Sequence, residues 1–405
     1  MPIARSRPIR YWLTAILVAN DNGVRARVLD ANQHIFLGRA LTPMNRIGII
    51  GAGQLGQMLG FAGQNLDLEC VFLDPSPDPP AAVVGPVLAL PFDSDEGLRK
   101  LASETDVVTY EFENVSVSAI EGIADETIVY PSPASLRYAQ DRLNEKRLFE
   151  SLQIPVAPYR AIDSIEDLRR AVQDIGLPLV LKTRRLGYDG KGQAILRGET
   201  DLENALTALG GSKLIAEQCI PFDREVSAIG VRNVRGDVAV YPLIENQHRE
   251  GILNISRAPA DATGLTELAN RYLETMLSHL AYVGVLTIEF FVVGDRLLAN
   301  EFAPRVHNSG HWTIEGARTS QFENHLRAIL DLPLGDVSPV GHAGMLNLIG
   351  SMPSQNLELA GDSAYLHDYG KQPRPGRKLG HITVVAADAA GRDRAVARLS
   401  EMLVA

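Results

Sequence analysis

The sequence is poor in cysteine, in aromatic residues and in long apolar runs. Its 405 residues include 2 cysteines, Cys70 and Cys219, and 6% aromatic residues. Each cysteine lies in an apolar stretch without metal-ligand spacing, which favours buried free thiols in a reducing compartment over a disulfide framework. No apolar run reaches the ~18 residues of a membrane span. We therefore expect a cytoplasmic protein with no disulfides, no membrane segment and no cysteine-bound metal.

The chain also lacks an excess of positive charge. The formal net charge is −10, with 45% hydrophobic and 22% charged residues. This balance argues against a general nucleic-acid binder, which usually needs a basic face, although it leaves room for a local basic pocket. A chain of this length is too long for one simple core, so two or three domains are expected.

Residues 1–43 differ in character from the rest. They carry Arg5, Arg7 and Arg10 and no acidic residue before Asp21. A targeting leader is one interpretation. The favoured interpretation is a misassigned start or a disordered extension, because "MNRIGIIGAGQLG" from Met44 reads as the start of a nucleotide-binding fold.

Strands alternate with helices in residues 44–140, which predicts a Rossmann-like parallel sheet. A strand is expected over "DVVTYEFENV", with Glu111 and Glu113 on one face. One long helix is expected over residues 132–152. We place a central domain at 141–338 and a small β-rich domain at 339–405. The predicted fold class is α/β.

The segment "GAGQLG", from Gly51 to Gly56, follows a strand and opens a helix, with Asp74 about 20 residues on. This fits a dinucleotide fingerprint. A Rossmann-like domain that binds no dinucleotide fits equally well, and no second half with dehydrogenase-like alternation follows.

The stretch "KTRRLGYDGKGQ" places Lys182 at a strand end before a glycine-rich hairpin, Gly187 to Gly192. Backbone amides in such a loop approach an anion closely. The stretch lacks the ending of a P-loop, so it suits a flexible hairpin over a triphosphate. An exposed turn is the alternative. A nucleoside could be bound by "EQCI", from Glu217 to Ile220, and by Glu225. Alternatively, these are ordinary surface residues.

Two acidic residues lie in "TIEFFVVGDRLLANEF". A three-residue loop, Gly294 to Arg296, would place Glu289 opposite Glu301. Such a pair repels without compensation, and Mg²⁺ would compensate it. A two-residue loop would place Glu289 opposite Asn300 and turn Glu301 to the other face.

Two polar clusters complete the pattern. "APRVHNSGHW" gathers Arg305, His307, Asn308 and His311, which suits a reaction centre beside a metal-bound phosphate. "KQPRPGRKLGH" supplies Lys371, Arg374, Arg377 and Lys378 in a loop shaped by Pro and Gly. It suits a phosphate monoester, although a charge run is more commonly a solvated surface.

The order of these motifs resembles ATP-grasp ligases from Met44 to the C-terminus. Within them, "GAGQLG", "NEFAPRVHNSGHW" and "RPGRKLGH" resemble the 5-(carboxyamino)imidazole ribonucleotide synthase family of purine biosynthesis. ATP-grasp enzymes often have Asn two places after the second metal Glu. Ala303 stands there in this chain, as in the resembled family, whose Asn precedes the Glu.

The resemblance implies that aminoimidazole ribonucleotide, ATP and bicarbonate give the carboxyamino product, ADP and phosphate through carboxyphosphate. It implies Mg²⁺ held by Glu289 and Glu301, a homodimer, and no nucleic-acid or membrane partner. The implied ATP ligands are Arg142, Lys182, Gly187, Tyr188, Asp189, Gly190, Lys191, Gly192, Glu217, Gln218, Cys219, Ile220, Glu225, His248, Asn300 and Glu301. The implied ribonucleotide ligands are Gln54, Leu55, Glu111, Asn308, Lys371, Arg377 and Lys378. The implied catalytic residues are Arg305 and His307, for bicarbonate and carboxyphosphate, and Lys378.

Three alternatives stay open at this stage. A formate-dependent phosphoribosylglycinamide transformylase would share the fold and metal but use another acceptor. The interpretation as a Rossmann-type oxidoreductase would be supported by "GAGQLG" and Asp74. A catalytically inactive regulatory protein would not need the intact set of charged residues.

Overall fold

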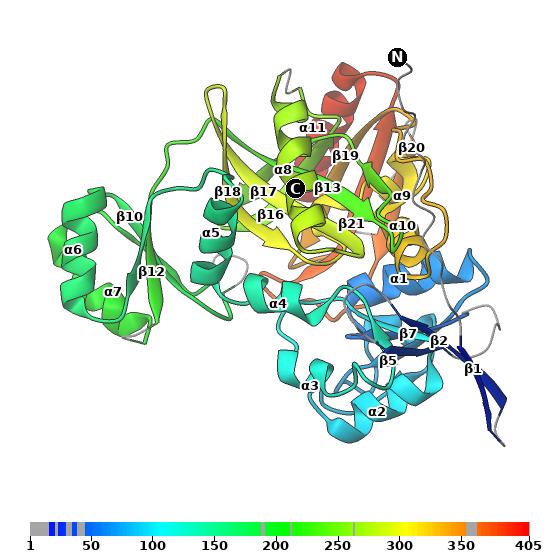
Figure 1. Ribbon diagram of the computed structural model, residues 1–405. Helices are drawn as coiled ribbons and strands as arrows, with labels where there is room; N and C mark the ends of the chain where they lie inside the picture. The colour runs from blue at the N-terminus through cyan, green and yellow to red at the C-terminus, as the bar shows by residue number, and fades with distance from the viewer. Residues whose placement is uncertain are drawn as a thin grey trace, which may run out of the picture. The chain divides into compact units, whose positions relative to one another are not determined.

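The structure is a computed structural model of the chain (Figure 1). It describes all residues except 1–15, 21–22, 30–34, 39–44, 188–190, 211–212, 262–263, 354–362 and 405. The chain divides into two compact units, Met1–Asn45 and Arg46–Ala405.

The first unit contains three strands that pair antiparallel in the order β1-β2-β3: β1 Ile16–Asn20, β2 Gly23–Leu29 and β3 Ile35–Gly38. The described part of this unit therefore departs from the expected disorder. Each strand is rich in Ile, Val, Leu or Phe, the residue types that favour extended backbone.

The second unit begins with the predicted parallel sheet, whose strands follow the order β6-β5-β4-β7-β8. These strands are β4 Arg46–Ile50, β5 Glu69–Leu73, β6 Val87–Leu88, β7 Val107–Tyr110 and β8 Ile128–Val129. The connecting segments are α1 Gln54–Gln64, η1 Pro80–Val83, α2 Asp95–Glu104 and α3 Val117–Glu121. Leu59 of α1 packs with Ile47 and Ile49 on one face, and Leu98 of α2 packs with Ile50 on the other.

The predicted helix over 132–152 is in fact two helices, α4 Pro133–Ala139 and α5 Arg142–Ser151. The break falls at Asp141, whose carboxylate caps α5 by accepting a 3.0 Å hydrogen bond from the amide of Leu143. Asp141 also binds the guanidinium of Arg184, so a contact distant in sequence fixes the break.

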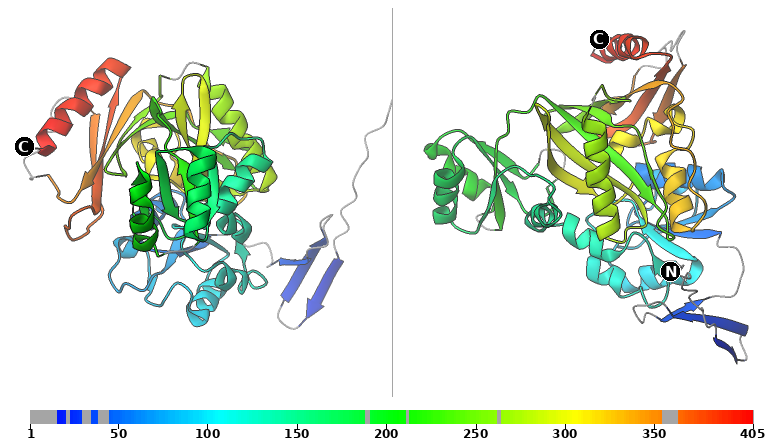
Figure 2. Two further views of the ribbon diagram at one scale, coloured as in Figure 1. Left: turned by 90° about the vertical axis from the view of Figure 1, so that its left-hand side faces the viewer. Right: turned by 45° about the horizontal axis from the view of Figure 1, so that its top comes forward.

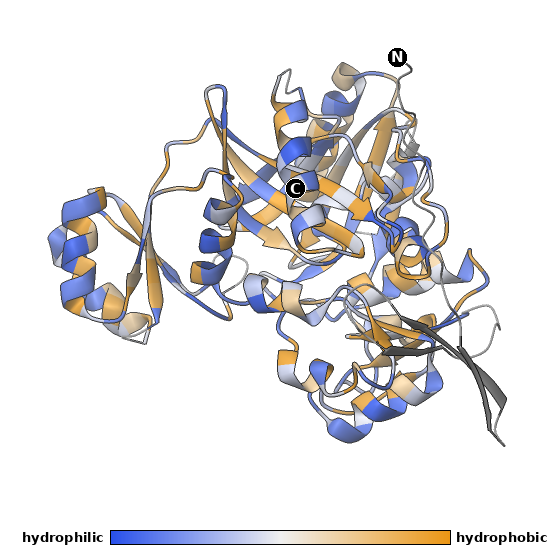
Figure 3. Ribbon diagram, in the orientation of Figure 1, coloured by the Kyte–Doolittle hydropathy of each residue, from blue (hydrophilic) through white to orange (hydrophobic). Residues whose placement is uncertain are grey.

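A four-stranded antiparallel sheet follows in the order β11-β10-β12-β9. Its strands are β9 Tyr159–Ile162, β10 Leu179–Thr183, β11 Gln193–Leu196 and β12 Leu214–Gln218. The segments packed on it are α6 Ile165–Ile175, η2 Glu199–Asp201 and α7 Leu202–Ala208. The helices α6 and α7 turn apolar faces to the strands and hydrophilic faces outward (Figure 3).

The largest sheet has nine strands in the order β18-β17-β13-β15-β16-β19-β21-β20, with β14 paired to β13. They are β13 Arg224–Arg232, β14 Val238–Val240, β15 Ile244–Arg249, β16 Ile252–Ala258, β17 Gly284–Val293, β18 Arg296–Ala303, β19 His342–Ile349, β20 Ser363–Asp368 and β21 Lys378–Ala386. The helical segments with it are α8 Leu265–His279, η3 Asn308–Gly310, α9 Thr313–Gly316, α10 Gln321–Ile329 and α11 Ala389–Val404.

The C-terminal strands continue this large sheet instead of forming one of their own. Strand β19 pairs with β16, and β21 pairs with β19, so the sheet crosses the expected boundary near residue 339. Helix α11 packs on β19 and β21 at the end of the chain (Figure 2). Within the described residues, no helix is both long and apolar enough to cross a membrane.

Candidate active site

A cavity of about 550 Å³ lies where the parallel sheet, the four-stranded sheet and the large sheet meet. The loops after β4 and β7, the strand β10, and the strands β17 and β18 all contribute to its walls. The expected site residues that line it are Gln54, Leu55, Glu111, Arg142, Lys182, Gly187, Glu225, His248, Glu289, Asn300, Glu301, Arg305, His307, Asn308 and Lys378. The structure thus brings together most of the positions that the sequence singled out.

The two acidic residues of the β17–β18 hairpin lie directly opposite each other, Glu289 against Glu301. The loop nevertheless has two residues, because Val293 pairs with Arg296. That loop length predicted Glu289 opposite Asn300. A β-bulge at Asn300 inserts one extra residue into β18 and restores the acidic pair. The expected pairing is correct, but the expected loop is not its cause.

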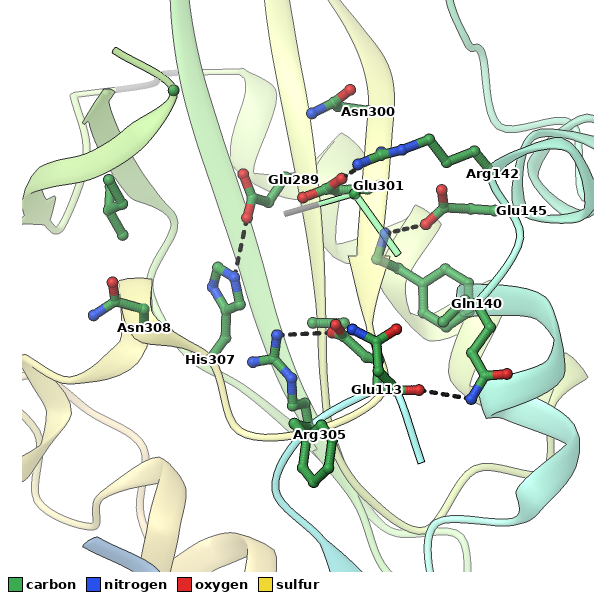
Figure 4. A pocket seen from close by; sticks show the side chains of 18 of the residues that line it. Glu113, Gln140, Arg142, Glu145, Glu289, Asn300, Glu301, Arg305, His307 and Asn308 are labelled. Atoms are coloured by element: carbon green, nitrogen blue, oxygen red, sulfur yellow. Dashed lines mark hydrogen bonds and ion pairs between the residues drawn. The ribbon is translucent and has the colours of Figure 1, made fainter. Parts of the chain in front are cut away.

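Each carboxylate of this pair has a cationic or polar partner (Figure 4). Glu301 Oε2 lies 2.8 Å from Arg142 Nη1, and Glu289 Oε1 lies 3.0 Å from His307 Nε2. Burial alone would raise the pKa of Glu301, but the charge and hydrogen bond of Arg142, together with the charges of Lys182 and His307, outweigh it and lower the pKa to about 2. Glu301 is therefore ionised at neutral pH and available as an oxygen ligand.

These residues fit a Mg²⁺ site. Asn300 Oδ1 is buried without a hydrogen-bond partner in the described part of the chain, and Asn300 is the bulge residue next to Glu301, which pairs with Glu289. In that same part no group of three or more His, Cys, Asp or Glu gathers as in an all-protein metal cage. Mg²⁺ is commonly held by one or two carboxylates plus substrate phosphates and water, so the donor set agrees with that ion.

Strand β10 carries Lys182 to the cavity, where its Nζ lies 3.1 Å from Glu217 Oε2. A second ammonium, that of Lys146 on α5, lies 3.4 Å from the same oxygen. Burial alone would raise the pKa of Glu217, but the two lysines outweigh it and lower the pKa to about 2. Burial lowers the pKa of Lys182. Both lysine ammoniums thus contact the Glu217 carboxylate, and the expected contact of Glu217 with a nucleoside stays a prediction.

Glu225 and His248 face each other from β13 and β15, and His248 Nδ1 contacts Glu225 Oε2. Burial alone would lower the pKa of His248, but the hydrogen bond to Glu225 and nearby carboxylates outweigh it and raise the pKa. His248, at the cavity wall, therefore keeps its proton and its positive charge to a higher pH than an ordinary histidine.

The reaction-centre cluster is held by the surrounding elements (Figure 4). His307 Nδ1 accepts a 3.3 Å hydrogen bond from the amide of Ser309, which places the ring proton on Nε2, facing Glu289. Asn308 exchanges amide hydrogen bonds with Asn347 of β19, at 2.8 and 3.1 Å. His311, by contrast, is buried outside the cavity lining.

Arg305 is held by Glu113, a residue that the sequence did not assign to the site. Arg305 Nη2 lies 2.8 Å from Glu113 Oε1, and Arg305 Nη1 donates to the carbonyl of Val306 at 2.9 Å. The Nε–H of Arg305 is buried without an acceptor among the described residues. Arg305 therefore has a donor available to an anion.

The prediction that Glu111 and Glu113 lie on one face of a strand is wrong. Strand β7 ends at Tyr110, and both residues lie in the loop that follows it. Glu111 turns to the amino end of α1, where its carboxylate accepts from the amide of Gly53 at 2.7 Å and of Gly56 at 2.5 Å. Burial raises the pKa of Glu111, and these amides oppose the rise.

This arrangement argues against a dinucleotide at "GAGQLG". A pyrophosphate would need the helix amides that Glu111 already occupies. Asp74, the acidic residue of that fingerprint, accepts from the amides of Ala52 and Ser76, at 2.9 and 2.8 Å. The helix terminus is satisfied within the protein, while Gln54 still faces the cavity.

The basic loop between β20 and β21 reaches the cavity through Lys378. Lys371 contacts the side-chain oxygen of Gln54, and burial lowers the pKa of Lys371 to about 8. Arg377 donates to the carbonyl of Gln372 at 3.1 Å. Neither Lys371 nor Arg377 lines the cavity in this structure. Both lie on the loop that leads to Lys378, the first residue of β21.

The glycine-rich hairpin is described in part. Gly187 lines the cavity, whereas Tyr188, Asp189 and Gly190 lie outside the described residues. Gly192 closes the hairpin by accepting from the amide of Thr183 at 2.8 Å, with a positive φ of 73°. Several expected residues do not line the cavity: Lys191, Gly192, Glu217, Gln218, Cys219 and Ile220. Cys219 is half-buried and not fully buried as expected, whereas Cys70 is buried.

Sequence reasoning missed several wall residues, among them Gln140, Glu145 and Arg184. Glu145 accepts from the amide of Phe302 at 2.7 Å, and burial together with the nearby Glu301 raises its pKa to about 8. The one available signal was position: Glu145 and Arg142 lie three residues apart on a helix, so they share a face.

Comparison with known proteins extends the resemblance. Residues 44–140 match a ribonucleotide synthetase preATP-grasp domain, 147–322 an ATP-grasp domain, and 343–394 a phosphoribosylaminoimidazole carboxylase C-terminal domain. N5-carboxyaminoimidazole ribonucleotide synthase of Pseudomonas aeruginosa is 47% identical over 360 residues, which cover 89% of this chain and 100% of the relative. The chain belongs to the N5-carboxyaminoimidazole ribonucleotide synthase family. It is thus an ATP-grasp ligase.

Solved structures of N5-carboxyaminoimidazole ribonucleotide synthases share the fold. The Thermus thermophilus enzyme has a TM-score of 0.85 at 49% identity, covering 88% of this chain and 98% of that one. The Aspergillus clavatus enzyme, solved with ADP and 5-aminoimidazole ribonucleotide, has a TM-score of 0.83 at 31% identity, with coverage of 89% and 99%.

Proposed function

We propose how this chain carries out the reaction of its family, the ATP-dependent conversion of 5-aminoimidazole ribonucleotide and bicarbonate into N5-carboxyaminoimidazole ribonucleotide. ATP phosphorylates bicarbonate, giving carboxyphosphate and ADP. The exocyclic amine of the ribonucleotide then attacks the carboxyl carbon, phosphate leaves, and the amine gives up a proton. One observation carries the proposal: a single cavity joins the predicted nucleotide, acidic and basic clusters.

We assign the nucleotide to the part of the cavity between β10 and the β17–β18 hairpin. The Lys182 ammonium and the Arg142 guanidinium face this part and suit phosphate oxygens. Glu225 and His248 suit the ribose hydroxyls and the phosphates respectively. The hairpin from Gly187 to Gly192 supplies backbone amides over the phosphates, and Glu217 to Ile220 supply backbone groups at the end of β12 toward the base.

We assign Mg²⁺ to Glu289 and Glu301, with Asn300 Oδ1 beside them. When bound, the ion supplies charge neutralisation for the transferred phosphoryl group. Arg142 holds Glu301 in place, and His307 holds Glu289. The two carboxylates are therefore oriented by residues of other elements before any ligand arrives.

We assign bicarbonate and carboxyphosphate to Arg305 and His307. The unpartnered Nε–H of Arg305 suits an oxyanion, since a fixed donor in a partly buried site stabilises developing negative charge. Glu113 fixes the guanidinium through its Nη2. Carboxyphosphate hydrolyses readily in water, so closure of the glycine hairpin over the site would protect it.

We assign the ribonucleotide to the basic loop and to the loop after β4. Lys378 and Arg377 would bind its phosphate, and Gln54, Leu55, Glu111, Asn308 and Lys371 would surround its sugar and base. Asn308 is held by Asn347, and Gln54 by Lys371, so both side chains are oriented in advance. A homodimer in the cytoplasm completes the proposal by resemblance to the family.

Release of ADP in bicarbonate buffer, with and without 5-aminoimidazole ribonucleotide, tests this assignment. ADP release that depends on both bicarbonate and the ribonucleotide is expected. Formate with phosphoribosylglycinamide, tried in the same assay, separates the transformylase alternative. Turnover with formate and none with bicarbonate would overturn the proposal. Absence of fluorescence change with a nicotinamide cofactor is expected from the occupied amino end of α1.

A further inference from the structure

Lys146 is a buried lysine that contacts two sheets but does not line the cavity. It lies on α5, and its side chain is 1% exposed. Its Nζ lies 2.8 Å from the carbonyl oxygen of Asn300 and 3.3 Å from that of Ala299, both on β18. The third neighbour is Glu217 Oε2 on β12, at 3.4 Å. An ammonium has three donor hydrogens, so these three acceptors satisfy Lys146 completely.

Glu217 is shared between Lys146 and Lys182. Lys182 Nζ lies 3.1 Å from the same oxygen, and Glu217 is the one acceptor for this ammonium in the described part of the chain. The two lysines differ in their surroundings, because Lys182 lines the cavity and Lys146 does not. One ammonium is thus fixed in the interior, while the other lies between Glu217 and the expected position of the phosphates.

The charges explain why two lysines are needed. One carboxylate neutralises one ammonium, so the trio carries one surplus positive charge. If Lys182 alone held Glu217, its movement to a phosphate would leave a buried carboxylate without a counterion, which is strongly unfavourable. With Lys146 in place, Glu217 keeps its partner when Lys182 moves.

We propose that Lys146 is a positioning residue for ATP: it holds the carboxylate of Glu217, and thereby leaves the ammonium of Lys182 available to the phosphates. The inference rests on the proposed function in one respect, the assignment of ATP to Lys182. It concerns a residue that touches neither substrate.

A second role of Lys146, support of the bulge at Asn300, does not account for its position by itself. The backbone on either side of the bulge has its own anchors. The amide of Ala299 donates to the carbonyl of Pro155 at 2.7 Å, and the amide of Phe302 donates to Glu145 at 2.7 Å. The bulge therefore keeps two hydrogen bonds without Lys146, whereas Glu217 keeps no side-chain partner except Lys182 among the described residues.

A double-mutant cycle in the full chain tests the proposal. The dissociation constant of Mg²⁺-ATP is measured by calorimetry for the wild type, Lys146→Met, Lys182→Met and the double variant. Each single variant is expected to weaken ATP binding about tenfold or more, since each prevents the charge-assisted contact between the Lys182 ammonium and the phosphates. The double variant is expected to be no more than about twofold weaker than Lys182→Met. Additive losses would overturn the proposal.

Kinetic constants distinguish positioning from general damage. Lys146→Met is expected to raise the Michaelis constant for ATP about tenfold and to leave that for the ribonucleotide within about twofold. Equal changes in both constants would indicate a merely structural residue and would overturn the proposal. Lys100→Met, an exposed lysine on α2, is the matched control and should change neither constant.

A second variant keeps the test decisive if Lys146→Met does not fold. The double variant Lys146→Met/Glu217→Gln removes the ammonium and the carboxylate together. No buried charge of this pair is left without a counterion, so the variant is expected to fold. Lys182 is then unrestrained, and ATP should bind within about threefold of the wild type. Binding about tenfold weaker in this variant would contradict the proposal. A wild type that binds no ATP would instead overturn the proposed function, so the two failures are distinguishable.

Discussion

Glu289 lies directly opposite Glu301 across β17 and β18, and this pairing depends on a β-bulge at Asn300. Without the extra residue, the two-residue loop would turn Glu301 away from Glu289. The bulge therefore creates the acidic pair that suits Mg²⁺, and it also directs Asn300 Oδ1 into a buried position where the described residues offer no partner. Bulges commonly re-aim side chains beside active sites.

Glu289→Gln should abolish or strongly reduce Mg²⁺-ATP turnover while the protein stays folded. The substitution removes one ligand charge, but glutamine still accepts from His307, and like-charge repulsion with Glu301 is relieved. We expect the free energy of unfolding to change by less than about 1 kcal/mol. Urea unfolding and turnover across a Mg²⁺ titration check both parts. Glu274→Gln, on the exposed face of α8, is the control. Normal turnover at low Mg²⁺ would show that the metal lies elsewhere.

Lys378→Ala and Lys182→Ala should affect different substrates. Loss of a charge-assisted contact to phosphate costs about 1.5–3 kcal/mol, which corresponds to about tenfold or more in affinity. Lys378→Ala should therefore raise the Michaelis constant for the ribonucleotide much more than that for ATP, and Lys182→Ala the reverse. Arg377→Ala should resemble Lys378→Ala and be non-additive with it. Steady-state kinetics varying each substrate decides this. Small, equal changes for Lys378→Ala would remove the basic loop from the acceptor site.

Because His325 stays neutral in the folded protein, it should make the fold less stable as the pH falls below the ordinary histidine range. His325 bridges the parallel sheet and β17, contacting Thr109 Oγ1 at 2.9 Å and the amide of Val285 at 3.1 Å. Burial lowers its pKa to about 3. The unfolded chain binds a proton near pH ~6.5 and the folded chain does not, so stability is present above pH ~6.5 and falls below it. The slope approaches about 1.4 kcal/mol per pH unit for this histidine.

Urea unfolding of the wild type and of His325→Gln between about pH 7 and pH 5 measures that slope as the difference between the two proteins, because the raised pKa values of Glu145 and His248 act in the opposite direction in both. His311 and His381 are also buried with pKa values well below the ordinary one, so they contribute to the pH dependence of both proteins. His325→Gln removes one titrating group and should make the dependence on pH shallower. An unchanged slope in this variant would show that His325 does not remain neutral in the folded protein.

A chain that begins at Met44 should fold and react as the full chain does. The parallel sheet is complete from β4 onward, and the matched preATP-grasp domain begins at residue 44. We expect the melting temperature of the main transition to stay within about 2 °C, since about 1 kcal/mol shifts it by about 2–4 °C in a large domain. A larger drop would mean that residues 1–43 stabilise the rest of the protein.

The sequence by itself indicated the order of the elements and many of the polar residues that line the cavity. Lys182 at the end of an apolar strand, the glycine hairpin after it, and the two polar clusters are local patterns. Local patterns survive in the fold because strand period, glycine content and helix start signals act over a few residues. The cavity therefore contains Lys182, Arg305 and Lys378 as expected.

Only the tertiary structure decided how these residues pair. The backbone on either side of the bulge at Asn300 is held by Pro155 and Glu145, which lie far earlier in the chain. No periodicity within residues 284–303 encodes such a contact. The orientations of Glu111 and Glu113 likewise depend on their partners, the amides of α1 and the guanidinium of Arg305. Buried charges and backbone amides require partners, and those partners are supplied by whichever segments the fold brings near.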